Sequence, residues 1–114
     1  MGGHCTKGNI DMLRAFTHSA GVIASILVVA DSGKHFSIGV APSLPDSYNA
    51  AVLANVTVTR GSGCCGTAAA TGERVVATDI RESVLWQDYV ELADDVGIRA
   101  CWSEPIRDGK GKVL

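Results

Sequence analysis

Blocks of apolar residues, separated by short polar segments, predict the order of strands and helices along the chain. Residues 22 to 29 form an apolar and β-branched run that only Ser25 interrupts, and the turn-forming sequence of residues 31 to 34 separates it from a second extended segment at residues 35 to 40. Two such runs joined by a short turn that contains glycine are typical of a β-hairpin. We therefore expect an antiparallel pair of strands in the first half of the chain.

Three segments carry apolar residues at the spacing of a single helix face. The first begins at Asn9 or Asp11, the second begins around Pro45, and the third runs from residue 85 or 86 to about Val96. Recurrence at positions i, i+3 and i+4 indicates an amphipathic helix. Proline suits the first turn of a helix because the N–H that it lacks is not needed there. These segments predict three helices.

The stretch from Gly61 to Ile80, GSGCCGTAAATGERVVATDI, predicts a turn, a short helix and a strand in close succession. The small residues from Thr67 to Ala70 favour a helix that lies close to another element, and Gly72 is suited to end that helix in the left-handed conformation. We expect a strand over residues 73 to 78 that ends at Asp79. Cysteines and a carboxylate then stand at the ends of regular elements, where functional sites are usually built.

The last part of the chain predicts a second hairpin. A strand is expected over residues 99 to 106, a turn over residues 108 to 111, and the start of a return strand over residues 112 to 114. Hairpins combined with helical crossovers predict an α+β domain with a mostly antiparallel sheet. We expect residues 1 to 8 to be flexible and residues 9 to 114 to form one domain.

Composition and charge narrow the class of function. The chain of 114 residues is 46% hydrophobic and 19% charged, and its net charge is −2. Nucleic-acid binding is not expected, because it depends on a basic patch. The most apolar run, residues 20 to 30, is shorter than the roughly 20 residues that span a membrane, and the first residues carry no secretory signal. We therefore expect a cytoplasmic protein that does not bind membranes.

The chain contains four cysteines, which raise the question of metal and thiol chemistry. They are Cys5, Cys64, Cys65 and Cys101, and no two of them form a Cys-x-x-Cys pair, so no metal site is expected. Reduced thiols are the default in the cytoplasm. We expect Cys65 to pack at a crowded helix start, Cys64 to lie at the surface and Cys101 to lie in the core. A reactive thiolate at Cys65 is the alternative, since a helix N-terminus lowers the pKa of a thiol.

Several spaced segments together resemble the GAF domain family, in particular the branch found in bacterial sensor kinases and in proteins that make or break cyclic dinucleotides. These segments are APSLPDSYNAAV, GSGCCGTAAATGERVVATDI, LWQDY, ELADDVGIRACWSEPI and DGKGKVL, and they cover roughly residues 10 to 114. Several motifs in the right order are more specific than any single motif. The resemblance implies a central antiparallel sheet of five to six strands flanked by helices, with the last strand, begun by Val113 and Leu114, truncated here.

The same resemblance implies a small-molecule pocket on one face of that sheet. Mapped onto this chain, the pocket wall consists of Tyr48, Cys65, Gly66, Thr67, Asp79, Trp86, Tyr89, Cys101, Trp102 and Ser103. Free backbone N–H groups at the start of the helix that contains Thr67 suit an anion or a carbonyl group. The aromatic side chains provide flat apolar walls. No metal or other cofactor is implied.

The function that the resemblance implies is that of a ligand-binding sensory or regulatory domain in bacterial signal transduction, without catalysis. One alternative is an enzyme like the free methionine sulfoxide reductases of this family, because Cys65-Gly66 resembles their G-x-C-G motif; Cys65 and Cys101 would then be the working pair. A second alternative is a dimerisation module without a ligand. The expected partners are a second copy of the chain and a kinase or cyclic-dinucleotide output domain. The incomplete last strand indicates a fragment, a rearranged terminus or a strand supplied by a partner chain.

Overall fold

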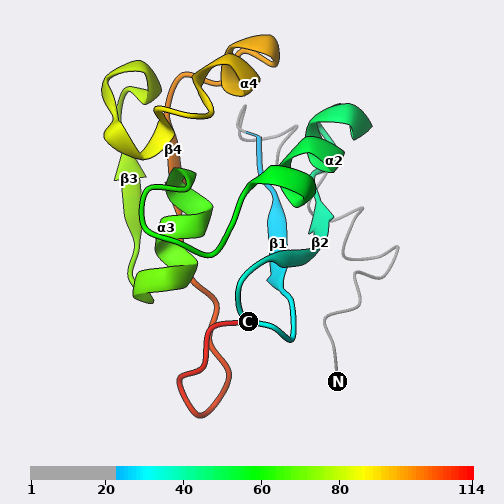
Figure 1. Cartoon of the computed structure of the whole chain (residues 1–114), viewed down its shortest axis with the longest axis vertical. Helices are drawn as coiled ribbons and strands as arrows, with labels where there is room; N and C mark the ends of the chain where they lie inside the picture. Colours follow the sequence, from blue (N-terminus) through cyan, green and yellow to red (C-terminus); the bar gives the residue numbers. More distant parts are fainter. Residues whose placement is uncertain (1–22) are drawn as a thin grey trace.

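The protein is described by a computed structural model in which residues 23–114 are placed, and the predicted flexible segment and first helix lie outside this range. Two antiparallel pairs of strands and the helices that pack on them form an α+β arrangement (Figure 1). In chain order the elements are β1 (Ile26–Val29), β2 (Phe36–Val40), α2 (Asp46–Asn55), α3 (Gly63–Thr71), β3 (Val75–Ala77), the 3-10 helices η1 (Ile80–Glu82) and η2 (Val84–Trp86), α4 (Val90–Asp95) and β4 (Cys101–Ser103).

The hairpin predicted in the first half of the chain is confirmed. β1 pairs with β2 in antiparallel register, with Ile26 opposite Val40 and Val28 opposite Ile38. Successive side chains of a strand point to opposite faces, and the side chain of Leu27 accordingly packs into the core with the buried Phe36. This strand pair therefore forms one wall of the interior.

The second strand pair joins β3 to β4, with Ala77 opposite Cys101 and Val76 opposite Trp102. Ala77 is buried, whereas the side chains of Val76 and Trp102 are 59% and 63% exposed. The strand predicted over residues 99 to 106 is reduced to three residues. The inward face of this pair consequently carries Cys101, and Trp102 lies on the outward face.

The structure differs from the predicted sheet of five to six strands. The described residues contain four strands in two separate pairs rather than one continuous sheet. The predicted turn at residues 108 to 111 is confirmed, because Arg107 forms an antiparallel bridge with Val113 beyond it. The backbone N–H of Val29 donates to the carbonyl oxygen of Leu114 across 2.7 Å, so the last residue of the return segment meets the end of β1 (Figure 1).

The predicted helix at residues 85 to 96 is wrong in its length and continuity. Its first residues form the separate 3-10 helix η2, and α4 begins only at Val90, because the N-cap residue Tyr89 has a non-helical φ of −126°. Trp86 and Tyr89 reach different parts of the preceding chain, and a regular helix would place both on one face. Tertiary contacts therefore interrupt the helix that the apolar pattern predicts.

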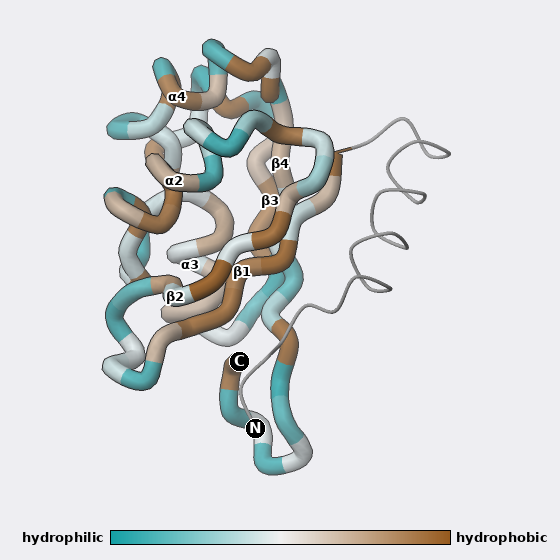
Figure 2. Tube along the Cα trace, turned by 90° about the vertical axis from the view of Figure 1, so that its right-hand side faces the viewer, coloured by the Kyte–Doolittle hydropathy of each residue, from teal (hydrophilic) through white to brown (hydrophobic). Residues whose placement is uncertain are grey.

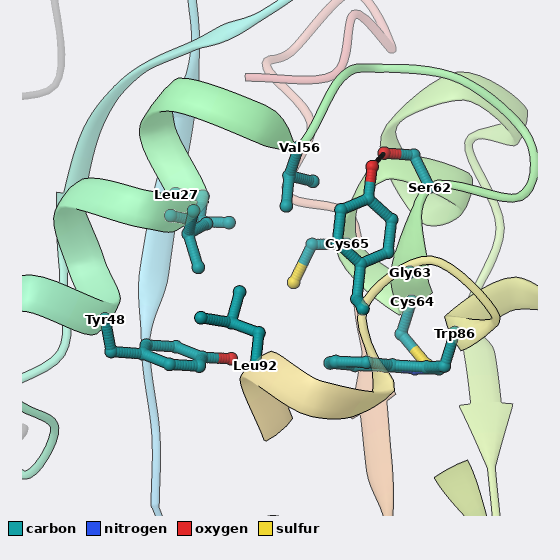
Figure 3. A pocket seen from close by; sticks show the side chains of 11 residues that line it. Leu27, Tyr48, Val56, Ser62, Gly63, Cys64, Cys65, Trp86 and Leu92 are labelled. Carbon is teal, nitrogen blue, oxygen red and sulfur yellow. Dashed lines mark hydrogen bonds between the residues drawn. The ribbon is translucent and has the colours of Figure 1, made fainter. Parts of the chain in front are cut away.

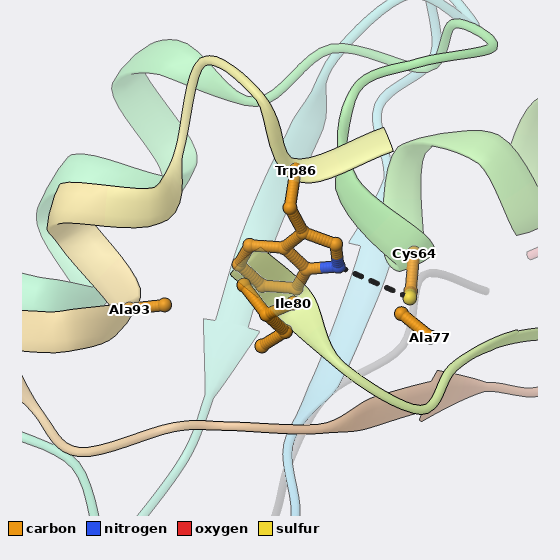
Figure 4. Packing of buried hydrophobic residues seen from close by; sticks show 5 residues of the cluster. All are labelled: Cys64, Ala77, Ile80, Trp86 and Ala93. Carbon is orange, nitrogen blue, oxygen red and sulfur yellow. Dashed lines mark hydrogen bonds between the residues drawn. The ribbon is translucent and has the colours of Figure 1, made fainter. Parts of the chain in front are cut away.

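Two adjoining clusters of apolar side chains make up the core. One contains the buried residues Cys64, Ala77, Ile80, Trp86 and Ala93 (Figure 4), and the other contains Phe36, Val52 and Val56. Tyr89 packs against both clusters. Figure 2 shows apolar residues concentrated along the strands. Within residues 23–114, no helix is both long and apolar enough to cross a membrane.

Candidate functional site

A small, mostly apolar cavity lies where α2, the start of α3 and the segment from η2 to α4 converge (Figure 3). Its volume is about 40 Å³, which is room for about one to three water molecules. The lining residues come from five parts of the chain and are Leu27, Tyr48, Val52, Val56, Ser62, Gly63, Cys64, Cys65, Trp86, Tyr89 and Leu92. The cavity therefore lies at the junction of the two core clusters.

The close approach of α3 to the connecting segment around Thr57 depends on Gly66. A Cβ atom at this position would lie 2.2 Å from the carbonyl oxygen of Thr57 and 2.8 Å from the Cβ of Ser62. Real Cβ atoms do not approach backbone this closely, so only glycine fits without a shift of the chain. The GSGCCG sequence thus brings the cysteines at the start of α3 to the edge of the cavity.

Ser62 and Tyr89 connect three segments around the cavity through hydrogen bonds. The hydroxyl oxygen of Ser62 accepts from the backbone N–H of Thr57 at 2.9 Å and lies 2.9 Å from the hydroxyl oxygen of Tyr89. The Tyr89 hydroxyl in turn donates to the carbonyl oxygen of Asn55 at 3.3 Å. When Ser62 donates to Tyr89, each of the two hydroxyl groups donates one hydrogen bond and accepts one. We call Ser62 and Tyr89 the hydroxyl pair.

Cys64 is fully buried, so the expectation that it lies at the surface is wrong. Its sulfur accepts a hydrogen bond from the indole N–H of Trp86 at 3.2 Å, and as a thiol it donates to the carbonyl oxygen of Cys101 at 3.7 Å. The pKa of Cys64 is lowered to about 7, mainly by a hydrogen bond from the Cys101 thiol, with smaller effects of Trp86 and the backbone of Ala77. These hydrogen bonds favour the thiolate more than burial disfavours it.

Cys65 has a different environment from its neighbour. Its sulfur lies 3.0 Å from the hydroxyl oxygen of Ser103, and burial raises the pKa of the Cys65 thiol. Burial also raises the pKa of Tyr48 to about 12, and the nearby Cys65 and Cys101 add to that effect. The pKa of Cys101 is raised by its hydrogen bond to Cys64 and by burial. Of the three described thiols, Cys64 is therefore the one that ionises first.

The sequence-predicted wall residues fall into three groups. Tyr48, Cys65, Trp86 and Tyr89 line the cavity. A second group stands behind that lining: Gly66 and Thr67 are buried in α3, and Cys101 and Ser103 contact the cysteines of the lining.

The third group, Asp79 and Trp102, does not reach the cavity. Asp79 is exposed and caps η1 by accepting from the backbone N–H of Arg81 at 3.0 Å. Trp102 lies on the outward face of β4. Asp79 lies two residues after the end of β3 and directly before η1, where a carboxylate can accept from the free N–H groups of the next turn.

The remaining lining residues were not among the predicted wall residues; they are Leu27, Val52, Val56, Ser62, Gly63, Cys64 and Leu92. The apolar spacing of α2 places Val52 on the inner face of the helix, which could have identified it. Ser62, in contrast, belongs to a glycine-rich turn, and nothing in its sequence neighbourhood predicts its contact with Tyr89.

An open groove on the surface adjoins the cavity, because Tyr89 and Leu92 line both. The groove has a volume of about 480 Å³ and lies between α2 and α4. Its remaining lining residues are Ala51, Asn55, Asp88, Glu91 and Asp95. Among residues 23–114, no group of three or more histidine, cysteine or acidic side chains is arranged to hold a metal ion.

Comparison with known proteins assigns the chain to a family. Residues 11–114 match the GAF domain family. The chain is 35% identical over 94 residues to the methyl sulfide methyltransferase-associated sensor of Methanosarcina acetivorans; the match covers 82% of this chain and 9% of that protein. No solved structure gave a significant match. The family and the sensor relative both support a sensory or regulatory role, and since the family match covers most of its length, the chain belongs to the GAF domain family.

Proposed function

We propose that this GAF domain is a non-catalytic sensor domain that binds a small molecule at the cavity and passes the signal to an output domain. The observation that carries the proposal is the cavity, whose wall combines apolar side chains with the hydroxyl pair. Binding sites for small molecules combine mostly apolar walls with a few placed polar groups. A ligand with an apolar body and one hydrogen-bonding end suits this wall.

The cavity is smaller than a typical ligand site. Such sites measure about 300–1,000 Å³, whereas this cavity measures about 40 Å³. Tyr89 and Leu92 separate it from the groove of about 480 Å³. Displacement of these two side chains joins the two spaces and admits a larger molecule. Ligand binding then favours the open arrangement of α4, and this change of population is the signal.

The proposed signalling context follows from the family and from the sensor relative. We propose a cytoplasmic domain that acts as a homodimer beside a kinase or cyclic-dinucleotide output domain of a bacterial type of signalling protein. The sensor relative supports an output domain, because the match covers only 9% of that protein. The movement of α4, which borders the open groove, is suited to pass the ligand signal to such a partner.

The geometry favours this function over a methionine sulfoxide reductase with Cys65 and Cys101 as its working pair. The sulfur of Cys65 faces Ser103, and burial raises the pKa of the Cys65 thiol, which leaves it a weak nucleophile. We expect no turnover of free methionine sulfoxide.

Native mass spectrometry of the freshly purified protein tests the proposal. We expect a retained small molecule in the parent and its loss in Val56→Ile, because the added methylene fills part of the cavity. Val84→Ile makes the same change at a side chain that is 76% exposed and outside the cavity, so it should retain the molecule. No retained molecule in the parent, or equal retention by Val56→Ile, would contradict the proposal.

A further inference from the structure

We propose that Cys64 and Cys101 form a redox-sensitive dithiol, which a small hydroperoxide converts into a disulfide between the start of α3 and β4. This inference does not depend on the identity of the proposed ligand. It rests on the position of the two thiols, on the surroundings of Cys64 and on the size of the cavity beside it.

The two thiols are neighbours although 37 positions separate them in the sequence. Cys64 is the second residue of α3, and Cys101 is the first residue of β4. Both pack in the same cluster with Ala77, which stands opposite Cys101 in the strand ladder. The Cys64 thiol donates to the Cys101 carbonyl oxygen at 3.7 Å, and the nearby Cys101 thiol lowers the pKa of Cys64. A bond between them thus joins elements that are already packed together.

The surroundings of Cys64 favour the thiolate, which is the nucleophilic form of cysteine. The indole N–H of Trp86 donates to the sulfur at 3.2 Å, and the neighbouring Cys101 thiol and Ala77 backbone also lower the pKa of Cys64. Figure 4 shows the indole nitrogen directed at the sulfur. With a pKa of about 7, a large fraction of Cys64 is ionised at neutral pH. Cys64 is therefore the attacking residue, and Cys101 supplies a proton.

The cavity determines which oxidants reach Cys64. The residue has no solvent-exposed surface, but it lines the cavity of about 40 Å³. Hydrogen peroxide is only slightly larger than water and fits this volume, whereas oxidised glutathione does not. The site is accordingly selective for small hydroperoxides.

The reaction proceeds in two balanced steps. The Cys64 thiolate attacks one oxygen of the peroxide, the O–O bond breaks, and Cys64 becomes a sulfenic acid while the released hydroxide takes up a proton as water. The Cys101 sulfur then attacks the Cys64 sulfur, and the sulfenic hydroxyl leaves as water with the Cys101 proton. Two thiols lose two electrons in total, and one peroxide is reduced to two waters.

The disulfide would alter the wall of the proposed ligand site. Cys64 lines the cavity, and its sulfur is the acceptor for Trp86, which lines the cavity as well. A disulfide between Cys64 and Cys101 fixes the start of α3 to β4. It also converts the thiol sulfur that accepts the hydrogen bond of Trp86 into a disulfide sulfur. Cys65 is not the partner, because its sulfur is directed at Ser103.

Peptide mapping of the full chain after treatment with hydrogen peroxide tests the inference. Blocking of free thiols and cleavage after arginine should yield residues 61 to 74 disulfide-linked to residues 100 to 107. We expect the linked peptides in the parent and in Cys65→Ser, and their absence in Cys64→Ser and Cys101→Ser. Oxidised glutathione at the same concentration should form the link at least about tenfold more slowly, because thiol exchange depends on access.

Three results would overturn the inference. The first is a parent that forms no link at an excess of peroxide. The second is a link that persists in Cys64→Ser but disappears in Cys65→Ser, which would assign the pair to Cys65. The third is equal rates with the two oxidants, which would exclude the route through the cavity. If Cys64→Ser does not fold, the parent, Cys65→Ser and Cys101→Ser decide the question.

Discussion

The indole N–H of Trp86 lies 3.2 Å from the sulfur of Cys64 and donates a hydrogen bond to it (Figure 4). This bond joins η2 to the start of α3, two segments that the chain connects only through β3 and η1. An indole is a donor only, so a buried tryptophan needs an acceptor of this kind. The same contact fills the core and supports the thiolate of the proposed dithiol.

Replacement of Trp86 by phenylalanine should lower stability and raise the pKa of Cys64. The substitution removes both buried volume and the hydrogen bond that favours the thiolate. We expect a loss of about 1–3 kcal/mol in the free energy of unfolding, measured by urea denaturation. Trp102→Phe is the matched control, because Trp102 is 63% exposed, and it should cost less than about 0.5 kcal/mol. Equal losses in the two variants would contradict the placement of Trp86 in the core.

The free energy of unfolding should rise as the pH increases from about 7 to about 9. The pKa of Cys64 is lowered from 9.0 to about 7 in the folded chain, so in this window the unfolded chain holds a proton that the folded chain has released. The gain is about 2 kcal/mol, because each pKa unit corresponds to about 1.4 kcal/mol. Above about pH 9 stability should fall again, because the pKa values of Cys65 and Cys101 are raised by folding.

Denaturation curves across this pH range should show the effect, and Cys64→Ser should abolish the rise. Tyr48 adds to the fall at higher pH, because its pKa is raised from 10.0 to about 12 and the unfolded chain ionises first. A parent protein whose stability declines steadily from pH 7 upward would show that the Cys64 thiolate is not favoured in the folded state.

Replacement of Tyr89 by phenylalanine should loosen the boundary between the cavity and the groove. The change removes the hydrogen bonds to Ser62 and to the carbonyl oxygen of Asn55 but retains the aromatic ring. We expect a loss of about 1 kcal/mol in stability. The amide of Ala93, which donates to the carbonyl oxygen of Tyr89, should exchange its hydrogen faster.

Tyr48→Phe provides the matched control for this experiment. Tyr48 also lines the cavity, and its hydroxyl group takes no part in the hydrogen bonds between Tyr89, Ser62 and Asn55. Amide exchange at Ala93 should therefore stay at the rate of the parent. Faster exchange in Tyr48→Phe than in Tyr89→Phe would show that the hydroxyl of Tyr89 does not hold α4 in place.

The sequence predicted local structure correctly at positions where a single residue type determines the backbone conformation. Gly72 ends α3 with a φ of 72°, as its position after the alanines predicts. The β1–β2 hairpin follows from its turn residues. The family followed from several motifs in order and is confirmed by the match over residues 11–114.

The contacts between distant segments could not be predicted in the same way. The alternation of β4 gives two faces, but pairing with Ala77 decides that Cys101 points inward and Trp102 outward. Likewise, the apolar spacing of Trp86 and Tyr89 fits one helix face, yet their partners Cys64 and Ser62 break that helix in two. Such choices depend on tertiary packing, which overrides local propensity.

Replacement of Gly66 by alanine should be the most destabilising of these changes, because it tests the close approach that forms the cavity. The added Cβ would meet the carbonyl oxygen of Thr57 at 2.2 Å, and a backbone atom cannot yield as the end of a side chain does. We expect a loss of about 3 kcal/mol or more. Gly109→Ala is the matched control, since nothing lies within 4 Å of a Cβ at that exposed turn position. Similar thermal midpoints for both variants would mean that α3 does not approach Thr57 this closely in solution, and the cavity wall would then require another arrangement.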